Sequence, residues 1–192
     1  MDCTIRKYKA SDKENLRYIC RETAGDYFRT DKKILNAVSV IYSDYFTENE
    51  AENIFVIADK DNNAVGYILC STDYELFKKK MRGKYIPDAV KTSIKMLPVC
   101  LGYMTAFLTN GKENSTHLHI DILPDYQHIG LGSQLIDTLR DYLCEKGITK
   151  LSVNTIDRTE SAYKFYMKYG FKENRHYVGS LYSLTIPTSR RE

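Results

Sequence analysis

Two glycines stand at the start of a helical pattern, where they could let the backbone approach a phosphate. They lie in the segment Gln127-His128-Ile129-Gly130-Leu131-Gly132-Ser133. Glycine lacks a Cβ atom, and the free amides and positive dipole end of a helix start favour an anion. A dinucleotide fingerprint would need a third glycine where Leu135 stands, and no Walker loop is present. The segment therefore indicates a phosphate-bearing ligand of another kind, or a loop that only turns the chain.

A second group of reactive side chains alternates along a strand pattern. One face carries His117, His119 and Asp121, and the other carries Leu118, Ile120 and Ile122. Histidine titrates near neutral pH and a neighbouring carboxylate can hold its tautomer, so His119 with Asp121 could relay a proton through water. Asp121 alone could instead anchor a cation. A polar sheet face exposed to solvent is the ordinary alternative.

The elements that must position these residues alternate between strand and helix. We expect strands at 117–122, 150–154, 172–178 and 180–186, and helices at about 130–146 and 158–169. A right-handed crossover makes 117–122 and 150–154 parallel neighbours.

The first half of the chain predicts an antiparallel meander with helices. Strands are expected at 4–8, 53–58 and 64–70, and a helix at about 31–46. Ser11 and Glu14 match a capping box for an earlier helix, and Asp61-Asn62-Asn63 suits a tight turn. Together the two halves predict an α/β fold with a mixed sheet.

Residues 72–115 are predicted to be an inserted lid or subdomain. Its helix from Pro87 is expected to stop at Pro98, and periodicity leaves 99–108 open between helix and strand. The basic run 78–84 predicts a solvated loop more readily than a nucleic-acid patch.

Composition predicts one soluble domain spanning 1–192. The net charge of +3 requires neither a nucleic acid nor a membrane as partner. Five scattered cysteines without a Cys-x-x-Cys pair suggest neither a disulfide framework nor a metal site. The N-terminal residues do not resemble a secretory signal, so a cytoplasmic location is expected.

Two blocks of the sequence resemble the GCN5-related N-acetyltransferase (GNAT) superfamily. The stretch from Ile122 to Gly132 is similar to its acetyl-CoA motif, Gln/Arg-x-x-Gly-x-Gly/Ala. Ala162-Tyr163-Lys164-Phe165-Tyr166-Met167-Lys168-Tyr169-Gly170-Phe171 is similar to its downstream Ala-x-x-x-Tyr-x-x-x-Gly-Phe block. Residues 117–124 also resemble the acetyltransferase-like domains that accompany O-GlcNAc hydrolases.

The resemblance implies a mostly antiparallel sheet with a central parallel pair that splays apart and helices on both faces. The pantetheine arm of acetyl-CoA would enter that opening and pair with the strand ending at Ile122. The implied cofactor-binding residues are Ile122, Leu123, Gln127, His128, Ile129, Gly130, Leu131, Gly132, Ser133, Asn154 and Thr159.

The resemblance also implies catalytic roles. Tyr166 occupies the position of the general acid, where its hydroxyl would stabilise the departing thiolate, although its helical spacing is equally that of a core residue. His119 and Asp121 are the candidates for the base. Thr159 stands where the family usually has Asn, which puts one cofactor hydrogen bond in doubt.

The sequence therefore predicts an acetyl-CoA-dependent N-acetyltransferase that acts on a primary amine, either a small molecule or a protein amino group. The alternative is a non-catalytic acyl-CoA-binding or regulatory module on the same fold. A homodimer stays open, and the sequence does not reveal the amine.

Overall fold

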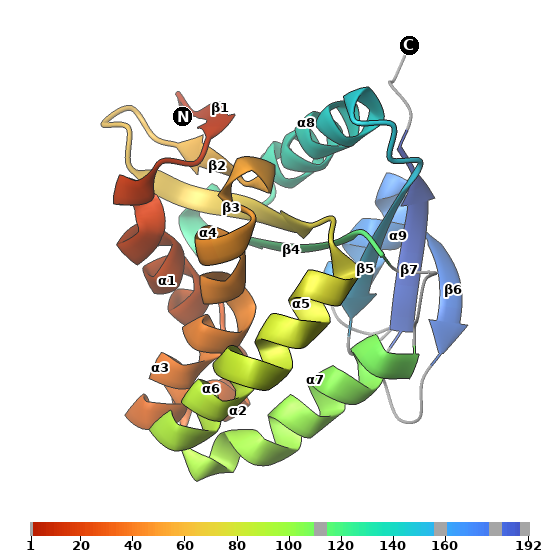
Figure 1. Cartoon of the computed structure of the whole chain (residues 1–192). Coiled ribbons are helices and arrows are strands. Elements are labelled where there is room, and N and C mark those ends of the chain that lie inside the picture. Colours follow the sequence, from red (N-terminus) through yellow and green to blue (C-terminus); the bar gives the residue numbers. More distant parts are fainter. Residues whose placement is uncertain (1, 110–114, 156–160, 177–181, 189–192) are drawn as a thin grey trace.

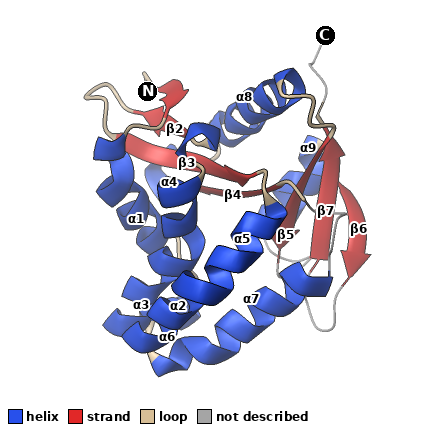
Figure 2. Ribbon diagram, in the orientation of Figure 1, coloured by secondary structure: helices blue, strands red, loops and turns tan. Residues whose placement is uncertain are grey.

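The computed structural model describes residues 2–109, 115–155, 161–176 and 182–188, with helices on both faces of a central sheet (Figures 1 and 2). The strands are β1 (Thr4–Lys7), β2 (Phe55–Ala58), β3 (Ala64–Ser71), β4 (His117–Ile122), β5 (Lys150–Thr155), β6 (Lys172–His176) and β7 (Tyr182–Pro187). The helices are α1 (Lys13–Glu22), α2 (Asp26–Arg29), α3 (Lys32–Ser39), α4 (Tyr45–Asn49), α5 (Tyr74–Lys80), α6 (Ile86–Thr92), α7 (Leu97–Thr109), α8 (Leu131–Glu145) and α9 (Ser161–Tyr169). None of the described helices is long and apolar enough to cross a membrane.

The described strands form one seven-stranded sheet in the order β1-β2-β3-β4-β5-β7-β6. Neighbouring strands are antiparallel except for β4 and β5, which are parallel. Asn62 adopts a φ of 62° in the turn between β2 and β3, as its residue type predicted. The mixed sheet with its central parallel pair is thereby confirmed.

Each face of the sheet has its own apolar core. Helices α1 and α3–α7 cover one face, where Ile19, Ile41 and Tyr67 are fully buried. Helices α8 and α9 cover the other face, where Leu139 and Phe171 are buried. Strand alternation divides β3 and β4 between these cores, so their side chains point into one or the other.

The predicted insertion is helical from Tyr74 to Thr109 and forms part of the first core. Phe77, Met81 and Tyr85 are almost completely buried in it. The segment is therefore a structural layer and not a detachable lid. Residues 97–109 form helix α7, which settles the ambiguity of the apolar run.

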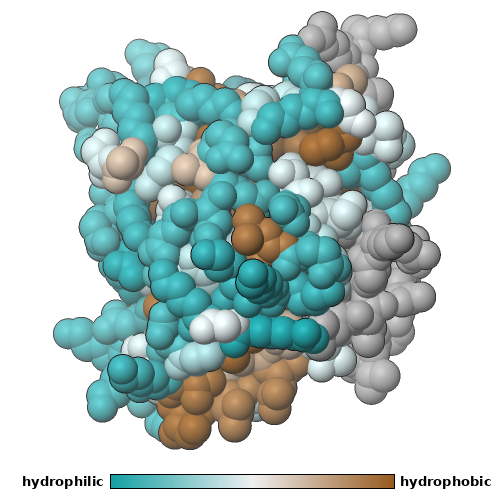
Figure 3. All heavy atoms as spheres, in the orientation of Figure 1, coloured by the Kyte–Doolittle hydropathy of each residue, from teal (hydrophilic) through white to brown (hydrophobic). Residues whose placement is uncertain are grey.

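Pro98 does not stop the preceding helix, contrary to the sequence prediction. Helix α6 already ends at Thr92, and Pro98 lies in the first turn of α7, where a proline needs no amide donor. The exposed apolar side chains of this layer include Ile94, Leu97 and Leu101. Figure 3 shows an apolar surface near α6 and α7.

The basic run is also not a loop, since it continues α5 into a π-helical turn at Met81–Tyr85. Lys80 and Arg82 are exposed, and Lys78 pairs with Glu75.

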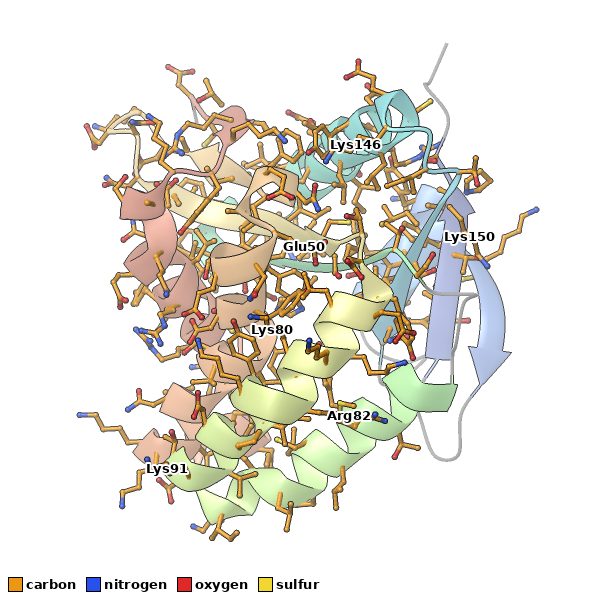
Figure 4. All side chains as sticks on the ribbon, viewed as in Figure 1. Glu50, Lys80, Arg82, Lys91, Lys146 and Lys150 are labelled. Carbon is orange, nitrogen blue, oxygen red and sulfur yellow. The ribbon has the colours of Figure 1, made fainter. Side chains whose placement is uncertain are left out.

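Glu50 lies inside the molecule (Figure 4), where it accepts hydrogen bonds from the Tyr45 hydroxyl and the Thr72 amide, both at 2.7 Å.

The predicted capping box of the first helix is wrong. Asp12, not Ser11, accepts the hydrogen bond from the Lys9 amide at 2.8 Å, while Glu14 pairs with Arg17 on the helix surface. Asp31 does cap α3, by accepting a bond from the Lys33 amide. The helix predicted for 31–46 is interrupted by a π-helical turn at Val40–Asp44 and continues to Asn49.

Candidate active site

Strands β4 and β5 part after a single pairing. In their described residues, only His117 and Ser152 are register partners, and the Ser152 amide donates to the Thr116 carbonyl at 3.0 Å. The strands then diverge (Figure 1). Alternation along β4 turns the backbone groups of Ile120 and Ile122 toward this opening, because Leu123 donates to Val65 on the other side. The expected splayed pair is confirmed.

The glycine-rich segment forms the N-terminal end of α8, at the same edge of the sheet. His128 and Gly130 have φ values of 63° and 89°, and Gly130 occupies the N-cap position without a side-chain cap. The first backbone amides of α8 therefore remain available to an anion. Ile129 beside them is 53% exposed, so the helix start is open to a ligand.

Gly132 has a second use that the sequence did not indicate. A Cβ atom there would lie 3.2 Å from Phe165 Cζ, so the missing side chain lets α8 approach α9 closely.

Gln127, predicted to touch the cofactor, donates from Nε2 to the Ile122 carbonyl at 2.7 Å. That bond satisfies one of the backbone oxygens that face the opening.

The polar residues of β4 form a connected group with Tyr67 of β3. His119 Nε2 lies 3.0 Å from Asp121 Oδ2, and the Tyr67 hydroxyl donates to the same oxygen at 2.5 Å. Burial, followed by the charge of Asp121, raises the pKa of Tyr67 well above its usual value, so this hydroxyl stays a donor. Tyr67 was not among the site residues predicted from the sequence. Only the pairing register of β3 and β4, which places Tyr67 opposite Asp121, could have identified it.

The face that carries these residues is only partly exposed to solvent, which corrects the alternative of an ordinary exposed sheet face: the side chains of His119 and Asp121 are 29% and 19% exposed, and His117 is buried. His117 is 3% exposed, with ring-centroid distances of 4.5 Å to Phe77 and 6.0 Å to Phe46. Burial, with a smaller contribution from His119, lowers the pKa of His117 to about 3, so it is neutral at physiological pH. His117 therefore belongs to the core.

Aromatic rings also surround His119. Tyr42 lies 5.3 Å from it, between ring centroids, and Tyr103 of the insertion lies 5.3 Å from Tyr42. A cavity of about 60 Å³ is lined by Tyr42, Phe46, Tyr103, His117, Leu118, His119 and Asn154. The insertion thus helps to form one wall of the opening, and Tyr42 and Tyr103 are further site residues that the sequence did not reveal.

Tyr166 and Asn154 lie on the elements beyond the opening. Tyr166 is 6% exposed and packs against Phe165 and Phe171, so it is a core residue, as its spacing allowed. Burial, followed by the charge of Asp121, raises the pKa of Tyr166, so its hydroxyl keeps its proton. Asn154 Oδ1 is buried and accepts no hydrogen bond from any described residue. Thr159 lies outside the described residues, as do Asp157 and Glu160.

Cys20 of α1 completes the surroundings of His119 and Asp121. It is 2% exposed, and its sulfur and one ligand atom from each of these two residues all lie within 4.8 Å of one another. In the described part of the chain this group could hold a metal ion. No sequence motif predicted this group, because Cys20 lies about a hundred positions before His119 and Asp121 in the chain.

The sequence model of the acetyltransferase (GNAT) family matches residues 17–171, which include the opening and the helix start. The chain belongs to the acetyltransferase (GNAT) family. No curated protein matches it significantly.

Several solved structures have the same fold as this chain. SsHAT is 24% identical with a TM-score of 0.83, covering 99% of this chain and 100% of its own. The PaiA N-acetyltransferase of Thermoplasma acidophilum, solved with coenzyme A, is 16% identical with a TM-score of 0.63, covering 97% and 99%. The polyamine N-acetyltransferase of Drosophila melanogaster is 13% identical with a TM-score of 0.61, covering 97% and 100%.

Proposed function

We propose that this protein is an acetyl-CoA-dependent N-acetyltransferase that transfers the acetyl group directly to a primary amine in a ternary complex. The observation that carries this proposal is the opening between β4 and β5, which has an uncapped helix start at its edge and His119 with Asp121 on its wall. A structural GNAT neighbour solved with coenzyme A supports the choice of cosubstrate.

The residues around the opening suit the two ends of acetyl-CoA. The amides at the start of α8 suit the pyrophosphate, because they combine free donors with the positive end of the helix dipole. The backbone of Ile120 and Ile122 suits the amides of the pantetheine arm, which would pair as a short extra strand. The buried Asn154 Oδ1 offers one further acceptor in the same gap.

The proton transfers follow from the side chains on either side. The amine loses a proton to His119, directly or through water, while the negative charge of Asp121, 3.0 Å from Nε2, stabilises the protonated imidazole and Tyr67 donates a hydrogen bond to Asp121. The amine nitrogen then forms its bond to the acetyl carbon as the bond from that carbon to sulfur breaks, and the second proton of the nitrogen passes through water to the leaving sulfur. The leaving sulfur accepts a hydrogen bond from Tyr166, whose raised pKa keeps its proton in place.

The decisive experiment measures turnover and binding separately. The full chain is incubated with acetyl-CoA and a panel of polyamines, aminoglycosides and peptides, and free thiol and acetylated amine are quantified. Calorimetry measures acetyl-CoA binding without an amine. Transfer to at least one amine is expected. Saturable binding without transfer to any amine would instead favour an acyl-CoA-binding module.

A charge swap tests where the phosphates lie. Ile129→Glu places a carboxylate beside the amides at the α8 start, and Ile129→Gln has nearly the same shape without the charge. Because an acidic residue at a helix start does not destabilise the helix, weaker binding cannot come from unfolding. We expect acetyl-CoA affinity to fall at least about tenfold for Glu relative to Gln. Equal affinities would remove this assignment.

A further inference from the structure

Three side chains of different types that can each bind a metal ion lie close together between α1 and β4. Cys20 comes from that helix, while His119 and Asp121 are two residues apart on the same face of β4. Their ligand atoms lie within 4.8 Å of one another, and His119 Nε2 and Asp121 Oδ2 are 3.0 Å apart. Ligand atoms around a tetrahedral zinc ion are separated by roughly 3.3–3.7 Å, as bond lengths of about 2.0–2.3 Å require. Small side-chain rotations would therefore suffice to bring all three onto one ion.

The contact between His119 and Asp121 has an unusual orientation. Nε2 is buried, yet its approach to the carboxylate does not have the alignment of a hydrogen bond, and no other described residue bonds to it. A nitrogen lone pair that is withdrawn from water and lacks a donor is suited to a metal ion. The carboxylate is held in place from behind by the Tyr67 hydroxyl, as second-shell groups commonly hold metal ligands.

We propose that Cys20, His119 and Asp121 form a binding site for Zn²⁺ or a similar divalent transition-metal ion, and that an ion bound there inhibits acetyl transfer. Thiolate, imidazole and carboxylate together select zinc-like ions over Mg²⁺ or Ca²⁺, which prefer oxygen alone. The thiolate and the carboxylate neutralise the charge of the ion. The side chains of His119 and Asp121 are 29% and 19% exposed, so the ion can enter from their side.

Binding exchanges a proton for the metal. Cys20 is one of the protein's free cysteines, and a metal ion replaces the proton of such a thiol. Binding forms a sulfur–metal bond and releases this proton to solvent. The inhibition rests on the proposed function, since the ion would bind both His119 and Asp121, the pair on which the proposed proton transfer depends. The binding itself does not depend on that function.

Cobalt is the first probe, because tetrahedral Co²⁺ with a thiolate ligand absorbs visibly. Titrating the full chain with Co²⁺ should produce these bands with one equivalent, and Zn²⁺ should abolish them. Cys144→Ser, which alters a cysteine outside the cluster, should keep the bands. Cys20→Ala should lose them and bind Zn²⁺ more than about 100-fold more weakly. Absence of bands in the parent protein, or their survival in Cys20→Ala, would overturn the site.

Two further variants keep the test decisive if Cys20→Ala does not fold. His119→Gln and Asp121→Asn each remove a different ligand, and both should weaken zinc binding in calorimetry while Cys144→Ser does not. Unchanged zinc affinity in both variants would refute the site.

The inhibition is measured on an amine that the protein acetylates. The product is quantified as acetylated amine, because zinc would bind the free thiol of coenzyme A. Zinc should suppress transfer by the parent protein, and a chelator should restore it, whereas Cys20→Ala should remain active and insensitive. If zinc binds without inhibiting transfer, or inhibits Cys20→Ala as strongly as the parent protein, the proposed inhibition is refuted but the proposed metal site is not. If no amine is acetylated, the cobalt titration still decides the metal site.

Discussion

Two tyrosines from different sides of the sheet are linked electrostatically to the carboxylate of Asp121. The Tyr67 hydroxyl donates a hydrogen bond to it, and burial, followed by the charge of Asp121, raises the pKa of Tyr166. Both hydroxyls stay protonated, but only Tyr166 belongs to α9, which packs against the start of α8. Tyr67 is therefore a positioning residue, whereas Tyr166 is the candidate donor to the leaving sulfur.

Replacing Tyr166 with phenylalanine should separate catalysis from packing. The variant keeps the ring that packs against Phe165 and Phe171, so its melting temperature should stay close to that of the parent. A hydrogen bond to a charged group contributes about 1.5–3 kcal/mol, so kcat should fall roughly 10- to 100-fold. Acetyl-CoA affinity should not change. An unaltered kcat at equal stability would leave Tyr166 as a core residue only.

His117 should make the protein sensitive to acid. Its pKa is about 3 in the folded protein, whereas an unfolded histidine titrates near 6.5. Between these two pH values the histidine is protonated in the unfolded chain and neutral in the folded protein. The free energy of unfolding therefore decreases as the pH falls from 6.5 toward 3. The histidine contributes a slope of up to about 1.4 kcal/mol per pH unit.

The measurement is the free energy of unfolding against pH for the parent protein and for His117→Phe. Phenylalanine keeps an aromatic ring beside Phe46 and Phe77 but does not titrate. We expect the variant to have the shallower slope, whatever its stability at neutral pH. Parallel curves would mean that His117 is protonated within the fold.

At the scale of elements, Gly66 controls how closely β3 approaches β4. A Cβ atom there would lie 2.8 Å from Ile57 Cδ1, 3.1 Å from Ile122 Cγ1 and 3.3 Å from the Asp121 carbonyl oxygen. Gly66→Ala should therefore destabilise the fold by about 1–3 kcal/mol and raise the KM for acetyl-CoA, because Ile122 must move. Denaturant unfolding and initial rates measure both effects.

Gly102→Ala is the matched control for Gly66. Nothing lies within 4 Å of its added Cβ, and the site is exposed in helix α7. Alanine is the better helix former by about 1 kcal/mol, so this variant should be slightly more stable. Equal destabilisation by both alanines would show that the contact at β4 is not the cause.

The helical insertion should select the amine and leave cofactor binding alone. Tyr103→Leu enlarges the cavity beside His119, so the relative kcat/KM for bulkier amines should rise by about 10-fold or more. Acetyl-CoA affinity, measured by calorimetry, should stay within about twofold. Leu101→Ala, on the exposed side of the same helix, should alter neither. A changed affinity with unchanged selectivity would contradict this assignment.

The sequence predicted those elements whose signal is local. The periodicity around Leu135 and Leu139 and the positive φ tolerated by Asn62 both led to correct assignments. It did not predict that helices cover His117 and His119, because burial of a strand face depends on residues far along the chain. The π-helical turns at Val40–Asp44 and Met81–Tyr85 were equally hidden, since neither carries its own residue signature.

The candidate site likewise has one part with a local sequence signal and one part without such a signal. Its proposed phosphate-binding end is contiguous in sequence from Gln127 to Ser133, so a motif could reveal it. Its other end assembles Tyr67, His119 and Tyr103 from three elements. Only the register of β3 against β4 and the packing of α7 bring them together, and neither is encoded in any local spacing.

For the molecule as a whole, the sheet separates two functions that meet at one gap. Helices α8 and α9 lie on one face and provide the proposed phosphate site and the proposed acid. The helices on the other face, from α1 to α7, surround the proposed base and form the acceptor wall. Variation within the core that α1–α7 cover can therefore alter the amine that is accepted, while the proposed cofactor contacts of α8 and α9 are kept.

The parting of β4 from β5 also affects how the backbone exchanges hydrogen with solvent. The amides of Ile120 and Ile122 point into the gap, whereas those of His119 and Asp121 point toward β3 and lie within its ladder. Deuterium should therefore replace the first two much faster than the second two, although all four belong to one strand. If acetyl-CoA pairs with this edge, the fast pair should slow on its addition, and the alternation along the strand should disappear.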